Sequence, residues 1–229
     1  EFRRVLFRSD GVKDGVMATP TECRFDPKKL QCTGAKNADC LTAEQVDAMK
    51  KIYNPLKRKD TGEQIYTGWV VGSEYVEGAG GWQTYWADMK KPEQPMRAEY
   101  FRGWLFHDPN WNPWSFDWAK DVDFARKRVG DMADMNNANL SAFKKRGGKI
   151  ILYQGWADPI VSALDTAAFF GKMDKATGNA DFARLFMVPG MGHCANGPGA
   201  TNFTFAMNTD ADHDAVLALE RWVEKGQAP

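Results

Sequence analysis

Apolar residues form two short uninterrupted runs towards the end of the chain. One follows Lys149, within the segment 149–153, and the other covers residues 185–188. Runs of this length are typical of parallel strands that are buried on both faces. Between them, apolar positions recur at helical spacing and predict a helix over residues 162–175. The order strand, helix, strand indicates a parallel pair joined by a crossover helix. The residues expected on the inner face of that helix are Leu164, Ala168, Phe169 and Met173.

A second helix is predicted near the C-terminus, over residues 212–225. Asp212 is expected to cap its first turn and Gly226 to end it. Its apolar face is expected to consist of Val216, Leu219, Trp222 and Val223. Because two strands do not make a stable parallel sheet by themselves, we expect the other strands of this sheet to lie upstream of the chain.

The preceding residues are less regular and contain one strongly predicted helix. Thr42 and Gln45 fit a capping box, apolar residues follow at helical spacing as far as Tyr53, and Asn54-Pro55 ends the helix. Residues 56–118 carry many turn signals and many aromatic side chains. The other helical segments expected in this part are 118–129, capped by Asp117, and a single turn at 141–145.

The pattern changes near Gly147-Gly148, which divides the chain into two parts. Residues 10–147 are loop-rich and tryptophan-rich and are expected to form a lid domain. Residues 148–229 are expected to form the C-terminal part of an α/β core. Residues 1–9 fit neither part: they are basic, lack an initiating methionine, and end in a tetrapeptide that reads like a translated sequencing adapter. We expect them to be non-native; a frayed basic tail is the alternative.

Composition and charge exclude several classes of protein. Hydrophobic residues make up 43% of the 229 residues and charged residues 26%, as in an ordered globular protein. Thirty basic residues balance thirty acidic ones, which argues against a nucleic-acid binder or a polybasic membrane anchor. No apolar run is long enough to cross a bilayer, so no membrane partner is expected.

The four cysteines indicate an oxidising compartment. Cys32 and Cys40 are closely spaced and flanked by loop residues, so a disulfide between them is expected, which implies a secreted or periplasmic protein. No C-x-x-C occurs, so a zinc ribbon is not expected. Cys23 and Cys194 have no obvious partner within the chain.

Candidate catalytic residues follow each of the two predicted strands. Asp158 lies in the loop after the first strand, and His193 follows the second strand, 35 residues later. Because parallel strands end at the same edge of a sheet, the two side chains are expected to meet there. A carboxylate at that place fixes the tautomer of the imidazole, whose other nitrogen can then accept a proton from a serine.

Each of these residues also has a purely structural interpretation. An aspartate before a proline is often a turn residue, and a histidine after a glycine is more often structural than catalytic. Their joint position at two successive strand ends favours the catalytic interpretation. His107 and His213 lack that context and are interpreted as surface or lid residues.

The chain contains no candidate nucleophile. In α/β hydrolases the order along the chain is serine, acid, histidine, so the serine is expected upstream. No G-x-S-x-G motif occurs, and the serines weighed as candidates are in loop or cap settings rather than between a strand and a helix. They are Ser73, Ser115, Ser141 and Ser162. We therefore expect this chain alone to be inactive.

The segments around both candidates resemble the tannase and feruloyl esterase family, which includes a hydrolase of a terephthalate monoester. The resemblance rests on Gly155-Trp156-Ala157-Asp158-Pro159 and Gly192-His193-Cys194, and it extends from Asp10 to the end of the chain. The other matching segments are Asp10–Val16 (DGVKDGV), Cys23–Pro27 (CRFDP) and Cys40-Leu41-Thr42. The resemblance implies an α/β-hydrolase core with a large inserted lid. It also implies that Cys194 pairs with a cysteine beside the catalytic serine, and that the partners of Cys194 and Cys23 lie upstream.

The Asp-Gly repeat near the N-terminus is a candidate calcium site. The carboxylates of Asp10 and Asp14 and the carbonyl groups of Val12 and Val16 offer oxygen ligands that suit Ca²⁺. Repeats of this kind are more often turns, so spacing alone leaves both interpretations open. The resemblance implies a structural, non-catalytic calcium there. It also implies an upstream aspartate and cysteine where this chain has Leu6 and Phe7, so the site is expected to be incomplete.

The expected reaction is hydrolysis of a small aromatic carboxylic ester, of the hydroxycinnamate or gallate type. The alternatives are hydrolysis of another aromatic ester, such as a terephthalate monoester, and a non-catalytic calcium-stabilised binding module. An aromatic stretch in the first part could line a pocket for a phenolic ring or form the core of the lid. It consists of Trp111, Trp114, Phe116 and Trp118.

Overall fold

The computed structural model describes residues 11–12, 14–87, 90, 97–134, 136–203 and 210–229. The predictions for residues 1–9 and for Asp10 lie outside these residues. The helices and strands of the first part are η1 Pro20–Glu22, η2 Pro27–Leu30, α2 Ala43–Tyr53, β1 Leu56–Lys57, β2 Gln64–Tyr66, β3 Tyr75–Val76, β4 Gly80–Gly81, α3 Trp82–Trp86, η3 Tyr100–Leu105, η4 Pro113–Ser115, α4 Lys120–Ala125, η5 Arg126–Gly130, α5 Asp131–Ala133 and α6 Ser141–Lys145. Those of the second part are β5 Ile150–Gly155, α7 Ala163–Thr177, β6 Ala183–Val188 and α8 Ala215–Lys225.

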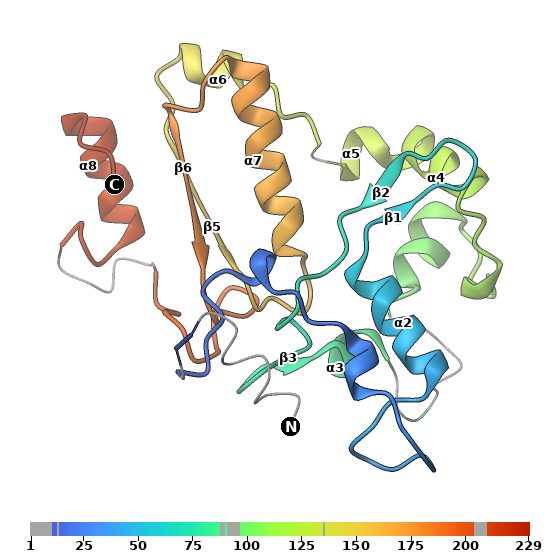
Figure 1. Ribbon diagram of the computed structural model, residues 1–229. Coiled ribbons are helices and arrows are strands. Elements are labelled where there is room, and N and C mark those ends of the chain that lie inside the picture. The colour runs from blue at the N-terminus through green and yellow to red at the C-terminus, as the bar shows by residue number, and fades with distance from the viewer. Residues whose placement is uncertain (1–10, 13, 88–89, 91–96, 135, 204–209) are drawn as a thin grey trace.

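Strands β5 and β6 pair in parallel, in register from Ile150 opposite Ala183 to Gly155 opposite Val188, as the sequence predicts. Helix α7 connects them and covers one face of the pair, while α8 lies on the other side (Figure 1). Met173 of α7 packs with Phe182 and Ala183 in the core between helix and strands. Within the described residues, β5 and β6 form a two-stranded sheet.

The prediction that both strands are buried on both faces is wrong for this chain. Most residues of β5 are half-buried, and Phe186 of β6 is 40% exposed. The reason lies on the α8 side, where a cavity of about 760 Å³ separates the strands from the helix. On the α7 side, Met173 is fully buried, but the prediction for Ala168 is wrong because that residue is exposed.

Helix α8 begins later than predicted, at Ala215. Asp214, and not Asp212, caps it: its Oδ1 accepts hydrogen bonds from the backbone N–H groups of Val216 and Leu217. The helix ends at Gly226, which adopts a positive φ of 68°, as predicted. The predicted apolar face is only partly buried, because Trp222 is enclosed while Val216 and Val223 are 40% and 59% exposed.

The first part is built from short elements, of which η2 packs against α2 and α4 packs against η5. The capping box of Thr42 and Gln45 is present, which confirms the start of α2. Strands β1 and β2, and likewise β3 and β4, form small antiparallel pairs. The predicted helix over 118–129 is instead a helical stretch from Lys120 to Ala133, made of α4, η5 and α5. Asp117 nevertheless accepts from the backbone N–H groups of Ala119 and Lys120, as a cap residue does.

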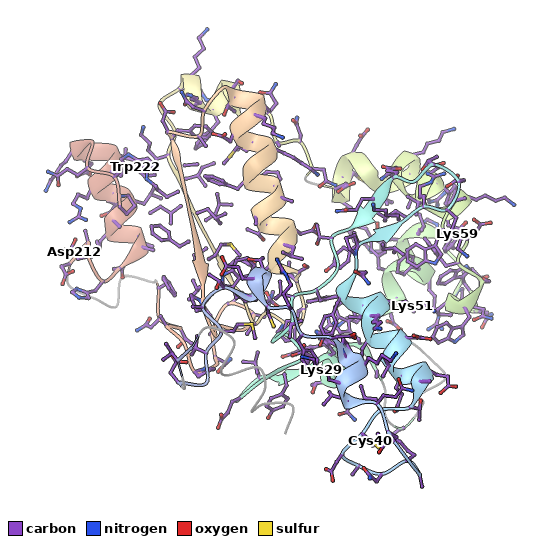
Figure 2. All side chains as sticks on the ribbon, in the orientation of Figure 1. Lys29, Cys40, Lys51, Lys59, Asp212 and Trp222 are labelled. Carbon is purple, nitrogen blue, oxygen red and sulfur yellow. A yellow bond between two sulfur atoms is a disulfide. The ribbon has the colours of Figure 1, made fainter. Side chains whose placement is uncertain are left out.

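The predicted disulfide between Cys32 and Cys40 is present and closes a short loop. Cys40 is labelled in Figure 2, where this loop projects away from β5 and β6. Cys23 and Cys194 are free thiols in the structure. Among the described residues, no helix is both long and apolar enough to cross a lipid bilayer.

The aromatic stretch of the first part forms a ring cluster. Trp111 stacks on Phe106 with their centroids 4.6 Å apart, and Phe116 packs edge-on against Phe101. Trp114 and Trp118 are exposed. Trp111 and Phe116 thus pack within this ring cluster, whereas the indoles of Trp114 and Trp118 are at the surface.

Candidate active site

The loops that follow β5 and β6 meet because Gly155 has no side chain. A Cβ at this position would lie 2.1 Å from the carbonyl oxygen of Met191 and 2.5 Å from that of Gly192, so any other residue would push the two loops apart. Backbone hydrogen bonds hold them together: Trp156 N–H donates to Val188 and Ala157 N–H donates to Met191. The loop of Asp158 and the loop of His193 are thereby fixed against each other.

Asp158 is buried, with 1% of its surface exposed, and its carboxylate is fully engaged. Oδ1 accepts hydrogen bonds from the backbone N–H groups of Ile160 at 2.8 Å and Val161 at 3.0 Å. A buried carboxylate needs such partners, since an unpaired buried charge is strongly unfavourable. The local turn therefore fixes Oδ1 and leaves Oδ2 to face the neighbouring loop.

The Nδ1 atom of His193 lies 2.9 Å from Asp158 Oδ2, as the sequence predicts for the pair. A carboxylate accepts hydrogen bonds, so we assign the proton of the neutral ring to Nδ1. Nε2 then carries a lone pair and can accept a proton. The histidine side chain is 41% exposed, so a reacting group can approach it from solvent.

Two further polar residues belong to this network and were missed by the sequence analysis. Gln154, on β5, donates from Nε2 to Asp158 Oδ2 at 2.7 Å. Thr166, on α7, donates from its hydroxyl group to Gln154 Oε1 at 3.0 Å. The only sequence signal was a polar residue at the end of an apolar strand, four positions before the aspartate. The contact with α7 is tertiary and leaves no local pattern.

An aromatic cavity lies on one side of the Asp158 loop. It has a volume of about 520 Å³. Ile160 and Val161 of the loop form part of its wall, and the rest comes mainly from the first part of the chain. Those residues are Ile52, Tyr66, Trp69, Trp82 and Trp86, with Asp165 at the edge. The predicted aromatic stretch 111–118 does not contribute to this wall.

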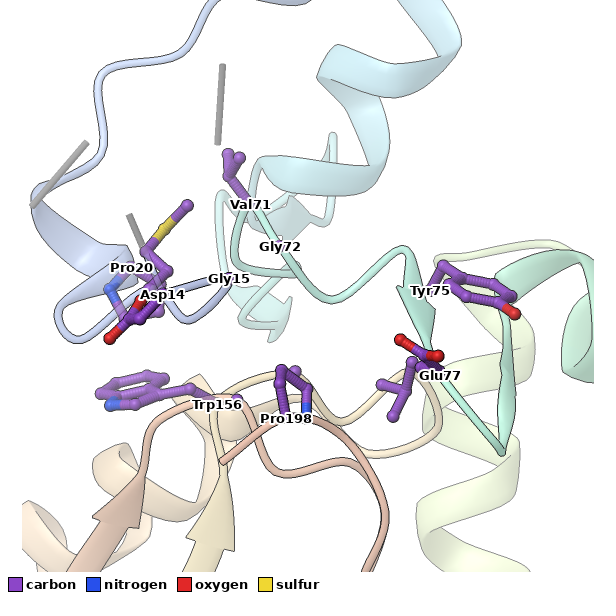
Figure 3. Close-up of a pocket in the computed structure, with 13 residues that line it drawn as sticks. Asp14, Gly15, Pro20, Val71, Gly72, Tyr75, Glu77, Trp156 and Pro198 are labelled. Atoms are coloured by element: carbon purple, nitrogen blue, oxygen red, sulfur yellow. The ribbon is translucent and has the colours of Figure 1, made fainter. Parts of the chain in front are cut away.

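A second cavity, of about 300 Å³, lies against the residues just before Asp158 and before His193. Figure 3 shows Trp156 and Pro198 on one side of it, and Val71, Gly72 and Asp14 facing them. Tyr75 and Glu77 close a third side. Residues on both sides of Asp158 thus line cavities, and the aromatic cavity is the larger of these two.

The predicted calcium loop contributes one carboxylate to the described part of the structure. Asp14 Oδ1 accepts from the backbone N–H of Val16 at 2.9 Å, and Gly15 has a positive φ of 80°, which is turn geometry. No group of three or more His, Cys, Asp or Glu side chains suited to a metal occurs among the described residues. Ca²⁺ takes about six to eight oxygen ligands, so this set does not fit the ion by itself.

The other histidines and the serines considered in the sequence analysis either lie away from this pair or form hydrogen bonds with other groups. His213 pairs with Asp210 at 2.7 Å and is exposed, and His107 is also exposed and lies beside Arg128. The hydroxyl groups of Ser73 and Ser162 donate to backbone carbonyl groups. Both serines are buried.

Comparisons with known proteins identify the family to which the chain is similar. The family model described as tannase and feruloyl esterase matches residues 8–229. A mono(2-hydroxyethyl) terephthalate hydrolase of Piscinibacter sakaiensis is 32% identical over 96% of this chain and 41% of its own length. A probable feruloyl esterase B-2 of Aspergillus flavus is 32% identical over 96% of this chain and 43% of its own length. The crystal structure of an esterase from Aspergillus oryzae covers the whole chain with a TM-score of 0.85 and 27% identity. The match takes up 46% of that structure.

These matches fix two facts about the chain. It shares its fold with an esterase over its entire length. It spans less than half of the length of the relatives it matches.

Proposed function

The chain belongs to the tannase and feruloyl esterase family, and from this premise we propose that it supplies the acid and the base of a serine-type carboxylic ester hydrolase. The observation that carries the proposal is the hydrogen bond between Asp158 and His193 at the carboxyl ends of two adjacent parallel strands. Ligands and catalytic groups of open α/β sheets gather at this edge.

In the proposed reaction, His193 Nε2 takes the proton of the attacking serine and then passes it to the departing alcohol. Asp158 holds the ring through Nδ1 and stabilises the imidazolium that forms during the reaction. The serine attacks the ester carbonyl to give an acyl-enzyme, which water then hydrolyses with the same base.

We propose that the nucleophilic serine lies outside these 229 residues. Two observations support this: the chain has no G-x-S-x-G motif, and it spans less than half of its relatives. The half-buried strands β5 and β6 are consistent with a larger sheet. By this proposal, the chain alone does not turn over esters.

The proposed substrates are esters of small aromatic acids, of the hydroxycinnamate or gallate type. The aromatic cavity supports this choice, because flat apolar side chains suit an aromatic ring. Its position beside Ile160 and Val161 would hold the acyl ring next to the catalytic pair. A terephthalate monoester is the second candidate, favoured by the relative of Piscinibacter sakaiensis.

Two further features are proposed for the protein as a whole. The disulfide of Cys32 and Cys40 supports a secreted or periplasmic location, since such bonds persist in oxidising compartments. A structural calcium would use Asp14 with the carbonyl groups of Val12 and Val16, and it would need Asp10 and further ligands to complete its shell.

The experiment compares the 229-residue chain with the longer polypeptide encoded by its source gene. Both are assayed on methyl ferulate, methyl gallate and mono(2-hydroxyethyl) terephthalate. We expect turnover by the longer protein only, with His193→Ala abolishing most of it. Turnover by the 229-residue chain, or full activity of the longer His193→Ala variant, would overturn the assignment. A longer protein that binds the esters without cleaving any of them would favour a non-catalytic binding module.

A further inference from the structure

We infer that Gln154, held in place by Thr166, is a positioning residue that orients Asp158 and thereby sets which nitrogen of His193 carries the proton. The inference rests on the proposed function of the Asp158–His193 pair. It assigns a role to two residues, one on β5 and one on α7, that do not contact a substrate.

Gln154 and His193 share one atom, Asp158 Oδ2. The amide Nε2 of Gln154 lies 2.7 Å from it and the imidazole Nδ1 lies 2.9 Å from it. The other oxygen of the carboxylate is held by the backbone N–H groups of the loop. All contacts of Oδ1 are therefore local, whereas Oδ2 is held from outside the loop.

This division of contacts has a mechanical consequence. Rotation about the Cβ–Cγ bond moves both carboxylate oxygens together, so any turn that the two bonds on Oδ1 tolerate also moves Oδ2 out of line with the imidazole. The hydrogen bond from Gln154 opposes that rotation. It also satisfies a lone pair of a buried charge, and hydrogen bonds to charged groups are stronger than those between neutral groups.

Thr166 supports the orientation of the Gln154 amide that the Asp158 carboxylate requires, because a carboxylate only accepts hydrogen bonds. A side-chain amide can present either its oxygen or its NH₂ group to a neighbour, and the wrong end would repel the carboxylate. The Thr166 hydroxyl group donates to Gln154 Oε1 at 3.0 Å, which turns the NH₂ group toward Asp158. Thr166, Gln154, Asp158 and His193 form one chain of hydrogen bonds that starts on α7 and ends at the candidate base.

The chain of bonds also has a purely structural interpretation, in which Gln154 and Thr166 only satisfy each other at the junction of β5 and α7. The two interpretations differ in what happens to His193. A structural role affects the stability of the fold, whereas a positioning role affects the proton on the imidazole ring even when the fold is intact.

The test is nuclear magnetic resonance on the 229-residue chain labelled with ¹⁵N at histidine. The nitrogen chemical shifts of His193 report whether Nδ1 or Nε2 carries the proton, and the Nδ1–H signal reports its exchange with water. The variants are Gln154→Met and Thr166→Val, which keep the side-chain shape and remove the hydrogen bond. Thr166→Ser keeps the hydroxyl group. Thr177→Val is the matched control, since the Thr177 hydroxyl donates to Met173 on the same helix, away from Asp158.

We expect the Nδ1–H form to dominate in the unchanged chain, in Thr166→Ser and in Thr177→Val. In Gln154→Met its signal should exchange about tenfold faster, with nitrogen shifts moving toward the Nε2–H form. Thr166→Val should change in the same direction by less. Unchanged shifts and exchange in both Gln154→Met and Thr166→Val would overturn the inference, as would an equal change in Thr177→Val.

The readout does not depend on turnover. The inference can hold for His193 even if the chain cleaves no ester. Conversely, it is wrong if the longer protein is active but its variants leave the protonation of the imidazole unchanged. In that longer protein the same inference predicts a loss in kcat for Gln154→Met with little change in KM, because the residue does not touch the substrate. Failure of the proposed function and failure of this inference are therefore separate outcomes.

Discussion

Trp86 donates its indole N–H to the carbonyl oxygen of Pro159 at 2.9 Å, which ties α3 to the loop that holds Asp158. The same loop is held a few residues later, where the Ser162 hydroxyl group donates to the carbonyl oxygen of Gly68. The first part of the chain thus contacts the loop of the candidate acid directly. The first part therefore positions this loop and also forms most of the wall of the aromatic cavity.

Replacement of Trp86 by phenylalanine should therefore lower stability while keeping an aromatic wall. The change removes one part-buried hydrogen bond and leaves the carbonyl group of the buried Pro159 without its donor. We expect the free energy of unfolding to fall by about 1–2 kcal/mol, measured by urea titration. Trp104→Phe is the matched control, because that indole is 60% exposed, and it should change the value by less than about 0.5 kcal/mol. Equal effects of the two substitutions would contradict this assignment.

The parts of the fold that sequence predicted were those determined by local or periodic signals. The capping box of Thr42 fixed the start of α2 because both of its hydrogen bonds are local. The parallel pair β5 and β6 followed from two apolar runs and the length between them. Asp158 and His193 followed in turn, since the end of each strand is readable and parallel strands end at one edge.

The features that sequence missed depend on tertiary contacts. Asp212 and Asp214 are both good caps, and only the chain path to α8 decides in favour of Asp214. Val216 and Val223 fit an apolar helix face, yet they stay exposed beside the cavity between α8 and the strands. Gln154 gave no periodic signal because its partners, Thr166 and Asp158, lie on another helix and in another loop.

Asp158→Asn should disable the candidate site without unfolding the loop. The amide oxygen can still accept from the backbone N–H groups of Ile160 and Val161, whereas its NH₂ group would replace the oxygen that faces His193. The imidazole would then turn to the Nε2–H tautomer and could no longer accept a proton. We expect kcat/KM of the longer protein to fall by about 10⁴-fold, by analogy with the serine protease triad.

The control for this prediction is Asp174→Asn. Asp174 also accepts a backbone N–H, that of Ala180 at 2.8 Å, but it lies near the C-terminal end of α7. Turnover should be unchanged in this variant. A loss of activity below tenfold for Asp158→Asn would contradict the role of the carboxylate.

Arg58 should be the most sensitive basic residue of the first part. Its guanidinium group is buried and forms a two-pronged contact with Asp60 and a further one with Asp123, joining β1 to α4. Lysine cannot make the forked contact. Arg58→Lys should therefore lower Tm by more than Arg126→Lys, whose arginine makes a forked contact with Glu63 in a more exposed position.

The same contact predicts the response to acid. The hydrogen bonds from Arg58 lower the pKa of Asp60 from 3.8 to about 2. The stability that this carboxylate adds to the folded protein is therefore complete above pH 3.8 and is lost as pH falls through about 2. In Arg58→Lys the pKa should lie closer to 3.8, so the acid-induced loss of stability should be smaller and should end at a higher pH. Thermal unfolding between pH 2 and 5 measures the shift. Superimposable Tm profiles of the two proteins would refute it.

Glu74 is a part-buried carboxyl group in the segment that lines the second cavity, and two effects on its pKa oppose each other. Burial raises the pKa above 4.5, while hydrogen bonds from the Tyr53 hydroxyl group and from the backbone N–H of Gly72 lower it. Burial has the larger effect, so the pKa is raised overall. Tyr53 stays protonated throughout, because burial and the neighbouring Glu74 raise the pKa of its hydroxyl group as well.

A raised pKa means that the folded protein holds this proton more tightly than the unfolded chain does. The stabilisation from neutral Glu74 is therefore complete below pH 4.5 and declines as pH rises through the higher folded value, with a slope of at most about 1.4 kcal/mol per pH unit. Glu74→Gln keeps acceptors for Gly72 and Tyr53 and removes the titration. Urea unfolding from pH 4.5 to 8 should show the variant gaining stability relative to the unchanged chain as pH rises. Glu77→Gln, at an exposed position three residues later, should run parallel to the unchanged chain. A Glu74→Gln curve that also runs parallel would mean that Glu74 is ionised in the folded state across this range.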